Sequence, residues 1–297
     1  MRSKLFVPAS RPELFAKALA SEADAISIDL EDSVVESRKA AARDNVREFL
    51  RSAEVSASGK IIIVRVNAIG TAHFESDVAA VAGPGLTMLN LPKPENAADV
   101  HLAAATLLRA EAANGAERAA GILANIETPA ALRNAHAIAA AHPRVAGLQL
   151  GLGDLFEPLG IDRRDPRNVH AAMWTLRMAA AEAGVFAYDG AFADVQDEAG
   201  YREEAAMARR LGFLGKSCIH PRQIAPANDV FRPNDEEIAR AQHMLDAWRR
   251  AGDHGAGAIL VDGKMIDAPF VRRAEMIVAA AGKWQRVQGR KNHPGDT

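Results

Sequence analysis

The chain has 297 residues, a formal net charge of −2 at pH 7 and a single cysteine, Cys218. Acidic and basic residues are interspersed, which excludes the basic surface expected of a nucleic-acid-binding or membrane-surface protein. One cysteine excludes an internal disulfide and a cysteine zinc cluster. No apolar run is long enough for a signal-peptide core or a membrane span. We therefore expect a cytoplasmic protein with one large domain or two ordinary ones.

Short apolar runs alternate with helical segments through most of the chain. Eight runs predict strands at Lys4–Pro8, Ala25–Leu30, Lys60–Val66, Thr87–Leu91, Gly121–Ile126, Gly147–Leu152, Gly184–Tyr188 and Gly212–Ile219. Helices are predicted between them at Pro12–Ser21, Val35–Ser52, Phe74–Val81, Ala97–Asn114, Pro129–Ala141, Arg167–Ala183 and Tyr201–Leu211. Several runs are nearly continuous Ile, Val and Leu, which is typical of strands covered on both faces.

This alternation predicts parallel strands joined by right-handed crossovers. Eight such units predict an α/β fold, a (β/α)8 TIM barrel, over residues 1–221. A doubly wound open sheet is the structural alternative, but no glycine-rich dinucleotide motif follows the first strand. After Pro221 the rhythm changes. A helix at Asp235–Arg250, a turn at Asp262-Gly263 and a helix at Pro269–Lys283 predict a C-terminal helical arm over residues 222–297.

Polar residues stand where the predicted strands end, and barrel enzymes carry their chemistry at those ends. In strand order they are Asp29, Glu31 and Asp32, then Arg65 and Asn67, then Lys93, Glu127, Asp154 and Asp189, and finally Lys216 and His220. Because the carboxyl ends of parallel strands meet at one rim, we expect these side chains to converge on one mouth.

Glu127 and Asp154 are the predicted metal ligands. Each follows an apolar run as a loop begins, and a few hard oxygen ligands suit Mg²⁺, which keeps several of its waters. Mn²⁺ is an alternative ion for the same ligands. The competing interpretation is that either carboxylate caps the helix behind it, since Thr128-Pro129 is a helix start.

Arg65 ends an unusually apolar strand, and a buried arginine needs an anionic partner. Its planar fork matches a carboxylate in two-point geometry, so it is predicted to bind a substrate carboxylate. An internal ion pair with Asp29 or Glu31 is the alternative. Asp29, Glu31, Asp32 and Lys93 are expected to support the metal and Arg65 from a second layer rather than to bind metal directly.

Lys93 and Lys216 allow a rival chemistry, because a lysine on a barrel strand can form a Schiff base with a keto substrate. Ion pairing with the acidic rim is the more ordinary interpretation of both residues. His220, before Pro221, is read as a structural loop residue, although it could act as a base. Cys218 lies within an apolar strand and is predicted to be plain core.

These residues resemble the citrate lyase beta-subunit-like family of the HpcH/HpaI aldolase group. The matching stretches run in order over nearly the whole chain: Arg2–Glu13, Asp29–Val34, Arg65–Asn67, Pro92–Lys93, Ile126–Pro129, Gly151–Leu155, Gly215–Pro221 and Asp262–Asp267. Each motif alone is weak, but together they are specific to the family and not to one substrate.

The resemblance implies a barrel enzyme, a carbon–carbon lyase that cleaves or forms 3-hydroxy-acyl thioesters of the malyl-CoA, citramalyl-CoA or citryl type. It implies that Glu127 and Asp154 bind Mg²⁺ and that Arg65 holds the substrate carboxylate. It also implies that Phe6, Arg11 and Lys17 contact coenzyme A. The partners implied are an acyl-CoA or acyl-carrier thioester and a 2-keto acid.

Asp267 matches a catalytic aspartate that the arm delivers into a neighbouring subunit's site, which implies a homo-oligomer, a trimer or a pair of trimers. Without the resemblance, Asp267 would be read as the N-cap of the last helix. Three other functions stay open. One is the beta subunit of a citrate lyase complex acting on a citryl acyl-carrier protein. Another is a non-catalytic acyl-CoA-binding homologue, and the third is a thioesterase side activity.

Overall fold

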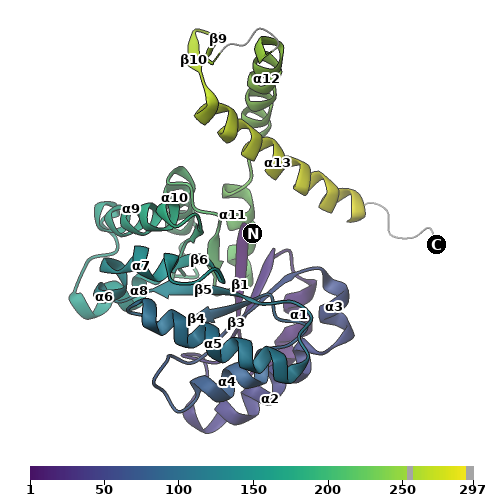
Figure 1. Ribbon diagram of the computed structural model, residues 1–297, viewed down its shortest axis with the longest axis vertical. Helices are drawn as coiled ribbons and strands as arrows, with labels where there is room; N and C mark the ends of the chain where they lie inside the picture. The colour runs from purple at the N-terminus through teal and green to yellow at the C-terminus, as the bar shows by residue number, and fades with distance from the viewer. Residues whose placement is uncertain (253–256, 292–297) are drawn as a thin grey trace, which may run out of the picture. The chain divides into compact units, whose positions relative to one another are not determined.

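The computed structural model describes residues 1–252 and 257–291. By its internal contacts the chain divides into two compact units, Met1–Phe231 and a unit that begins at Arg232. The strands of the first unit are β1 (Ser3–Pro8), β2 (Ala25–Asp29), β3 (Ile61–Arg65), β4 (Met88–Leu91), β5 (Gly121–Ile126), β6 (Val145–Leu150), β7 (Phe186–Tyr188) and β8 (Lys216–Cys218). They lie at the centre of this unit, with helices around them (Figure 1).

The eight strands are parallel and pair in the order β7-β6-β5-β4-β3-β2-β1-β8. The two ends of this sheet meet, because Asp189 after β7 forms a parallel bridge with Lys216 of β8. The N–H of Leu214 also donates to the carbonyl of Ala187 at 2.9 Å. The sheet therefore closes into the predicted TIM-barrel-like fold, and the open-sheet alternative is wrong.

The helices of this unit occupy the connections between strands. They are α1 (Phe15–Ala20), α2 (Lys39–Leu50), α3 (Ala53–Ser58), α4 (Phe74–Val81), α5 (Ala97–Asn114), α6 (Pro129–Arg133), α7 (Ala135–Ala140), α8 (Leu152–Phe156), α9 (Pro166–Glu182), α10 (Glu198–Arg210) and α11 (Ile224–Val230). Short 3-10 turns stand at η1 (Pro12–Leu14), η2 (Glu36–Arg38), η3 (Glu157–Leu159) and η4 (Pro221–Gln223). Local signals set their ends: in α5, the Asn96 side chain accepts from the N–H of Asp99, and Gly115 adopts the left-handed conformation that closes the helix.

Most predicted strand and helix bounds differ from the structure by a few residues, and the predicted helix Pro129–Ala141 is divided into α6 and α7. Two differences affect the site and the division into units. Strand β6 ends at Leu150, and α8 begins at Leu152, because the N–H of Leu155 donates to the carbonyl of Gly151 at 3.1 Å. Asp154 therefore lies in the first turn of a helix. The first unit also extends beyond Pro221 to Phe231, since α11 buries Ile224 and Ala227 in the barrel's core cluster.

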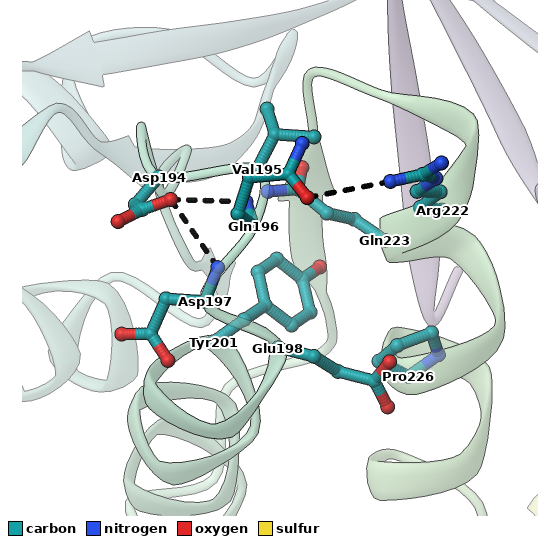
Figure 2. Close-up of a pocket in the computed structure, with 9 residues that line it drawn as sticks. All are labelled: Asp194, Val195, Gln196, Asp197, Glu198, Tyr201, Arg222, Gln223 and Pro226. Atoms are coloured by element: carbon teal, nitrogen blue, oxygen red, sulfur yellow. Dashed lines mark hydrogen bonds between the residues drawn. The ribbon is translucent and has the colours of Figure 1, made fainter.

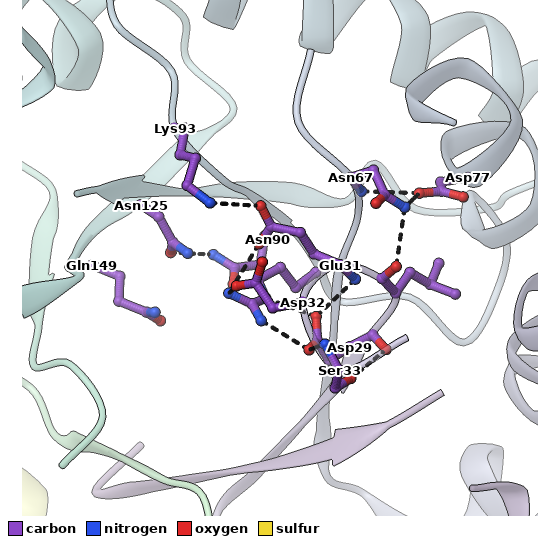
Figure 3. Close-up of polar contacts among 12 residues, drawn as sticks. Asp29, Glu31, Asp32, Ser33, Asn67, Asp77, Asn90, Lys93, Asn125 and Gln149 are labelled. Atoms are coloured by element: carbon purple, nitrogen blue, oxygen red, sulfur yellow. Dashed lines mark hydrogen bonds and ion pairs between the residues drawn. The ribbon is translucent and has the colours of Figure 1, made fainter. Parts of the chain in front are cut away.

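Side chains inside the barrel form layers of increasing polarity. Alternation along each strand sends every second residue inward. The apolar layer consists of Ala25, Ile63, Met88 and Leu123. Above it lie the buried polar residues Ser27, Asn90, Asn125 and Gln149. The amide of Asn90 donates to Oδ1 of Asn125 at 2.7 Å (Figure 3). The layer at the carboxyl ends of the strands is charged.

The second unit consists of α12 (Asp235–Gly252), β9 (Ile259–Val261), β10 (Lys264–Ile266) and α13 (Ala268–Lys291). A capping box starts α12, since the Asn234 side chain accepts from the N–H of Glu237 at 2.7 Å and the Glu237 carboxylate accepts from the N–H of Asn234 at 2.8 Å. The unit has its own small core of Ala241, Leu245, Ile266, Val271 and Ala274. Over the described residues, no helix is both long enough and apolar enough to cross a bilayer.

Candidate active site

Asp29 and Arg65 form a bidentate ion pair at the carboxyl ends of β2 and β3. They are register partners in the parallel sheet, so their side chains leave neighbouring strands toward the same side. Nε and Nη2 of Arg65 donate to the two oxygens of Asp29 at 2.7 and 2.8 Å. The same oxygens accept the N–H groups of Glu31 at 3.0 Å and Ser33 at 3.1 Å. Figure 3 draws the hydrogen bonds that Asp29 makes with Glu31 and Ser33 of the following loop as dashed lines.

The other end of the Arg65 guanidinium holds two more carboxylates. Nη1 lies 3.0 Å from Glu31 and 3.1 Å from Asp32. The internal ion pair that the sequence allows is therefore formed. Asp32 is the replaceable partner, because its side chain is 59% exposed whereas that of Asp29 is 4% exposed. Burial opposes the charge of Arg65, but Asp29, Glu31 and Asp32 outweigh it and raise the pKa of this arginine.

The Asp29–Arg65 pair predicts a pH dependence of stability. Burial acts to raise the pKa of Asp29, but hydrogen bonds and charge from Arg65 outweigh it and leave that pKa below its ordinary value. The unfolded chain then binds a proton at higher pH than the folded one, so the contribution of Asp29 is present above about pH 4 and lost below it. We expect the difference in unfolding free energy between wild type and Asp29→Asn to narrow between pH 5 and 3, as measured by urea denaturation. A difference that stays constant over this range would contradict the assignment.

Lys93 contacts three acidic residues, each of which follows a different strand of the barrel. It has a left-handed backbone, with φ of 51°, between Pro92 and Pro94. Its Nζ lies 3.1 Å from Glu31 and 3.0 Å from Asp154. Its backbone N–H donates to Glu127 at 3.1 Å. Strained backbone of this kind is typical of functional sites. We call Asp29, Glu31, Asp32, Arg65, Lys93, Glu127 and Asp154 the mouth cluster.

Glu127 is buried with its carboxylate turned into the mouth cluster. The helix-cap alternative is wrong for this residue, because Thr128 caps α6 by accepting the N–H of Ala131 at 3.1 Å. Gly151 leaves the space that Glu127 occupies: a Cβ there would lie 2.5 Å from Oε2 of Glu127. Asp154, 45% exposed, stands beyond it in the first turn of α8.

The Glu127–Asp154 pair fits a hard divalent cation. Burial first, and then the charges of Glu31 and Asp154, raise the pKa of Glu127 to about 7 against the opposing effect of Lys93 and Arg65. A cation placed among these oxygens would relieve that unfavourable charge. Among the described residues no group of three or more His, Cys, Asp and Glu side chains is arranged as a metal site. Two carboxylates without further protein ligands suit Mg²⁺, which retains water.

Asp189 and Lys216 do not join the mouth cluster, contrary to the sequence-based expectation. Lys216 is fully buried and pairs with Asp189 at 2.7 Å and with Glu204 of α10 at 2.6 Å. Arg163 completes this network, 2.6 Å from Glu204. Burial lowers the pKa of Lys216, but the two carboxylates outweigh it and raise that pKa. A protonated, enclosed amine is not a nucleophile, which disfavours a Schiff base at Lys216.

Two further residues have structural roles. The His220 side chain caps η4 by accepting the N–H of Arg222 at 3.2 Å. Burial raises the pKa of the Cys218 thiol to about 11, so Cys218 is a plain core residue as predicted. A small pocket of about 120 Å³ lies beside η4 (Figure 2). Its acids serve local structure: Asp194 accepts two N–H groups of its own turn, and Asp197 caps α10.

The residues expected to meet coenzyme A lie on and after β1. The ring of Phe6 is 5.3 Å from the Arg65 guanidinium carbon, so Phe6 borders the mouth cluster. Arg11 and Lys17 are exposed, Lys17 on α1. Arg11 pairs with Glu13, and the hydrogen bond from Arg11, with the charges of Arg11 and Lys17, lowers the pKa of Glu13. The two cations are thus close to one carboxylate and accessible.

Asp267 belongs to the second unit, directly before α13. Its carbonyl accepts the N–H of Val271 at 3.1 Å, so the main chain starts the helix as an N-cap residue does. Its side-chain Oδ1 has no hydrogen-bond partner among the described residues. Oδ1 of Asp267 therefore does not cap the helix.

Several polar residues inside the barrel were not predicted from the sequence. Lys4 donates to Gln149 and lies 4.5 Å from the Phe6 ring centre. Burial, and then the charge of Arg65, lowers its pKa well below the ordinary value. Such residues can be found in the sequence as single polar residues at inward-facing positions of an apolar run. Examples are Asn125 in Ile-Leu-Ala-Asn-Ile and Gln149 in Gly-Leu-Gln-Leu.

A model of the HpcH/HpaI aldolase/citrate lyase family matches residues 2–221, and the chain belongs to this family. This membership confirms the resemblance drawn from the motifs. The L-malyl-CoA/beta-methylmalyl-CoA lyase of Rhodobacter capsulatus is 35% identical over 301 residues, covering 94% of each chain. Citrate lyase subunit beta of Escherichia coli K12 is 35% identical over 287 residues, covering 94% of this chain and 93% of the relative.

Solved structures show the same fold. Protein CitE from Mycobacterium tuberculosis, in complex with magnesium, acetoacetate and coenzyme A, matches with a TM-score of 0.75 and 35% identity over 95% of this chain and 100% of that one. A citrate lyase from Burkholderia xenovorans matches with a TM-score of 0.81 over 95% of this chain and 92% of that one. Since its identity is 22%, this second likeness shows the fold alone.

Proposed function

We propose that this protein is a Mg²⁺-dependent carbon–carbon lyase. It cleaves a 3-hydroxy-acyl-CoA of the malyl-, citramalyl- or citryl-CoA type to acetyl-CoA and a 2-keto acid, and it catalyses the reverse condensation. The observation that carries the proposal is the mouth cluster, which places two carboxylates suited to Mg²⁺ beside an arginine suited to a carboxylate. The relatives named as lyases, and the neighbour solved with magnesium, acetoacetate and coenzyme A, support it.

Glu127 and Asp154 would hold the ion, with Mn²⁺ able to replace Mg²⁺ at these oxygens. When bound, the ion supplies Lewis-acid polarisation of the keto-acid oxygens. Arg65 binds the substrate carboxylate by releasing Asp32, its exposed partner, while Asp29 keeps the guanidinium in place. Another neighbour, the citrate lyase beta subunit of M. tuberculosis, is complexed with oxaloacetate and magnesium, a ligand pair of this kind.

In the cleavage the substrate hydroxyl oxygen loses its proton and becomes a carbonyl oxygen, and the electron pair of the broken C–C bond passes into a thioester enolate. One proton leaves the hydroxyl group and one is added to the enolate carbon, so the reaction has no net proton change. The enolate carbon then takes up a proton. We assign this proton transfer to Asp267, whose Oδ1 has no partner among the described residues. Phe6, Arg11 and Lys17 contact coenzyme A, the two cations facing its phosphates. Because Asp267 lies in the arm unit, beyond residues 1–221, we propose a cytoplasmic homotrimer or hexamer in which each arm completes a neighbour's site.

A citryl acyl-carrier protein is the second candidate substrate. The E. coli citrate lyase subunit beta is as similar to this chain, at 35% identity, as the malyl-CoA lyase. Activity of the purified protein alone on CoA esters favours the first candidate. A requirement for the carrier protein favours the second. A non-catalytic homologue predicts coenzyme A ester binding without turnover.

The deciding experiment is a condensation panel of acetyl-CoA with glyoxylate, pyruvate or oxaloacetate, with and without EDTA. We expect one keto acid to react, EDTA to abolish the reaction, and added Mg²⁺ to restore it.

Glu127→Gln should raise the Mg²⁺ concentration for half-maximal rate at least about tenfold, since one of two ionic ligands is lost. Glu117→Gln, an exposed site outside the mouth cluster, is the matched control. Turnover that persists in EDTA would refute the proposal.

A further inference from the structure

Lys39, the first residue of α2, is a buried cation behind the loop that follows β2. Its side chain belongs to neither the metal pair nor the rim predicted from the sequence. Nζ donates to the carbonyl of Leu30 at 2.9 Å, to the carbonyl of Glu31 at 3.1 Å and to Oδ1 of Asn67 at 2.6 Å. An ammonium group has three N–H donors, so every donor is used, and each acceptor is a neutral oxygen.

The peptide group between Leu30 and Glu31 is held from both sides. Its carbonyl accepts from Lys39, and its N–H donates to Oδ1 of Asp29 at 3.0 Å. In a trans peptide these two groups point in opposite directions. The orientation of this one plane therefore sets the direction in which the loop meets Asp29, and Asp29 in turn holds Arg65 through two hydrogen bonds.

Lys39 also ties the loop after β2 to the loop after β3. Asn67 accepts from Lys39 and donates its amide to the carbonyl of Leu30 at 3.0 Å and to Asp77 at 2.6 Å. Asp77 is fully buried and pairs with Arg43 at 3.1 Å. Arg65 is two residues before Asn67, so both strands that carry the Asp29–Arg65 pair are held by the same ammonium.

We propose that Lys39 is a positioning residue for the substrate-carboxylate site. Lys39 fixes the orientation of the Leu30–Glu31 peptide and thereby sets the geometry of the Asp29–Arg65 pair. The same peptide directs the Glu31 side chain toward Arg65 and Lys93. Lys39 itself does not contact the substrate. The inference rests on the proposed function in one respect, namely that Arg65 binds the carboxylate of a 2-keto acid.

The test compares Lys39→Met with Lys60→Met. Lys60 also donates to two main-chain carbonyls, those of Ser21 at 2.8 Å and Ala23 at 2.6 Å, but it stands before β3, at the opposite end of the barrel from the mouth cluster. Pyruvate binding in saturating Mg²⁺ is measured by calorimetry, and KM and kcat are measured in the condensation direction. Lys39→Met should weaken pyruvate binding and raise KM roughly 10- to 100-fold, the cost of a misplaced binding group. Lys60→Met should leave both within about twofold of wild type, since it removes hydrogen bonds far from the site.

The outcomes separate cleanly. A folded Lys39→Met protein, by circular dichroism, with wild-type pyruvate affinity overturns the proposal, as does an equal loss in Lys60→Met. If Lys39→Met does not fold, Lys39→Gln, which keeps a donor for one carbonyl, is judged by the same criterion. A wild-type protein that neither binds nor converts any keto acid defeats the proposed function instead. Hydrogen exchange of the Glu31 and Ser33 amides then judges positioning alone, with faster exchange expected in Lys39→Met and not in Lys60→Met.

Discussion

Asp267→Asn is expected to lower kcat about 10²- to 10⁴-fold, the usual contribution of a positioned general acid or base. The substitution keeps the shape of the side chain and replaces the carboxyl group, which can donate or accept a proton, by an amide that does not act as a general acid or base. Mg²⁺ and pyruvate affinities should stay within about twofold, because these ligands are assigned to Glu127, Asp154 and Arg65 of the barrel, whereas Asp267 is assigned only to the proton transfer. The measurement pairs single-turnover rates with calorimetry. Asp262→Asn is the matched control, since Asp262 is an exposed aspartate of the same unit. An unchanged kcat in Asp267→Asn would remove Asp267 from the mechanism.

Co-expression tests whether the arm serves a neighbour. Neither Asp267→Asn nor Glu127→Gln alone should support turnover under limiting Mg²⁺. If each site combines one chain's metal pair with another chain's arm, an equal mixture should recover about a quarter of wild-type activity, because a heterologous ring pairs chains at random. If the arm serves its own barrel, no mixed site is complete and no activity returns. This second result would leave Asp267 catalytic but make each chain a self-sufficient enzyme.

Lys216→Met is expected to lower the free energy of unfolding by about 3–5 kcal/mol, the cost of removing one partner from a buried ionic network. Lys216 is enclosed and neutralises Asp189 and Glu204, so its loss leaves two carboxylates buried without their shared cation. The same residue forms the bridge that closes the barrel between β7 and β8. Urea denaturation followed by circular dichroism measures the loss.

Two comparison variants make this result specific. Arg202→Met breaks two largely exposed pairs, with Glu198 of α10 and with Asp229 of α11, and should cost below about 1 kcal/mol. Adding Asp189→Asn to Lys216→Met should recover part of the stability, because one unpaired charge is then removed. A loss below 1 kcal/mol for Lys216→Met would show that the network is not a stabilising element.

Much of the barrel was predictable because its strands are short and apolar. Runs such as Ile61–Val64 can only be buried, and their alternation with helical segments leaves few topologies. Two helices, Phe74–Val81 and Ala97–Asn114, match their predicted bounds, and α5 has an unambiguous cap at each end. The placement of Glu127 and Asp154 near one another was predictable for a similar reason, since each follows a buried parallel strand of one sheet; that they bind a metal ion stays a prediction.

It was not predictable whether a charged residue near the end of a strand faces the mouth cluster or the surrounding helices. Asp189 and Lys216 have the same sequence context as Glu127, a charged residue beside an apolar run. The structure turns them toward Glu204 of α10 and Arg163, away from the mouth cluster. With strands as short as β7 and β8, a shift of one residue reverses the side that a residue faces, and periodicity does not resolve that shift.

The sequence by itself determined the fold class, the family, and the acids and the arginine at the strand ends, because these follow from apolar runs and from motifs in a fixed order. Only the tertiary structure decided which charges meet. It joined Lys93 to Glu31, Glu127 and Asp154, gave Arg65 its internal partners, and placed Lys39 behind the loop after β2. The reason is physical: the pKa and partners of a charge depend on burial and on neighbours distant in the chain. Those neighbours exist only once the sheet has closed.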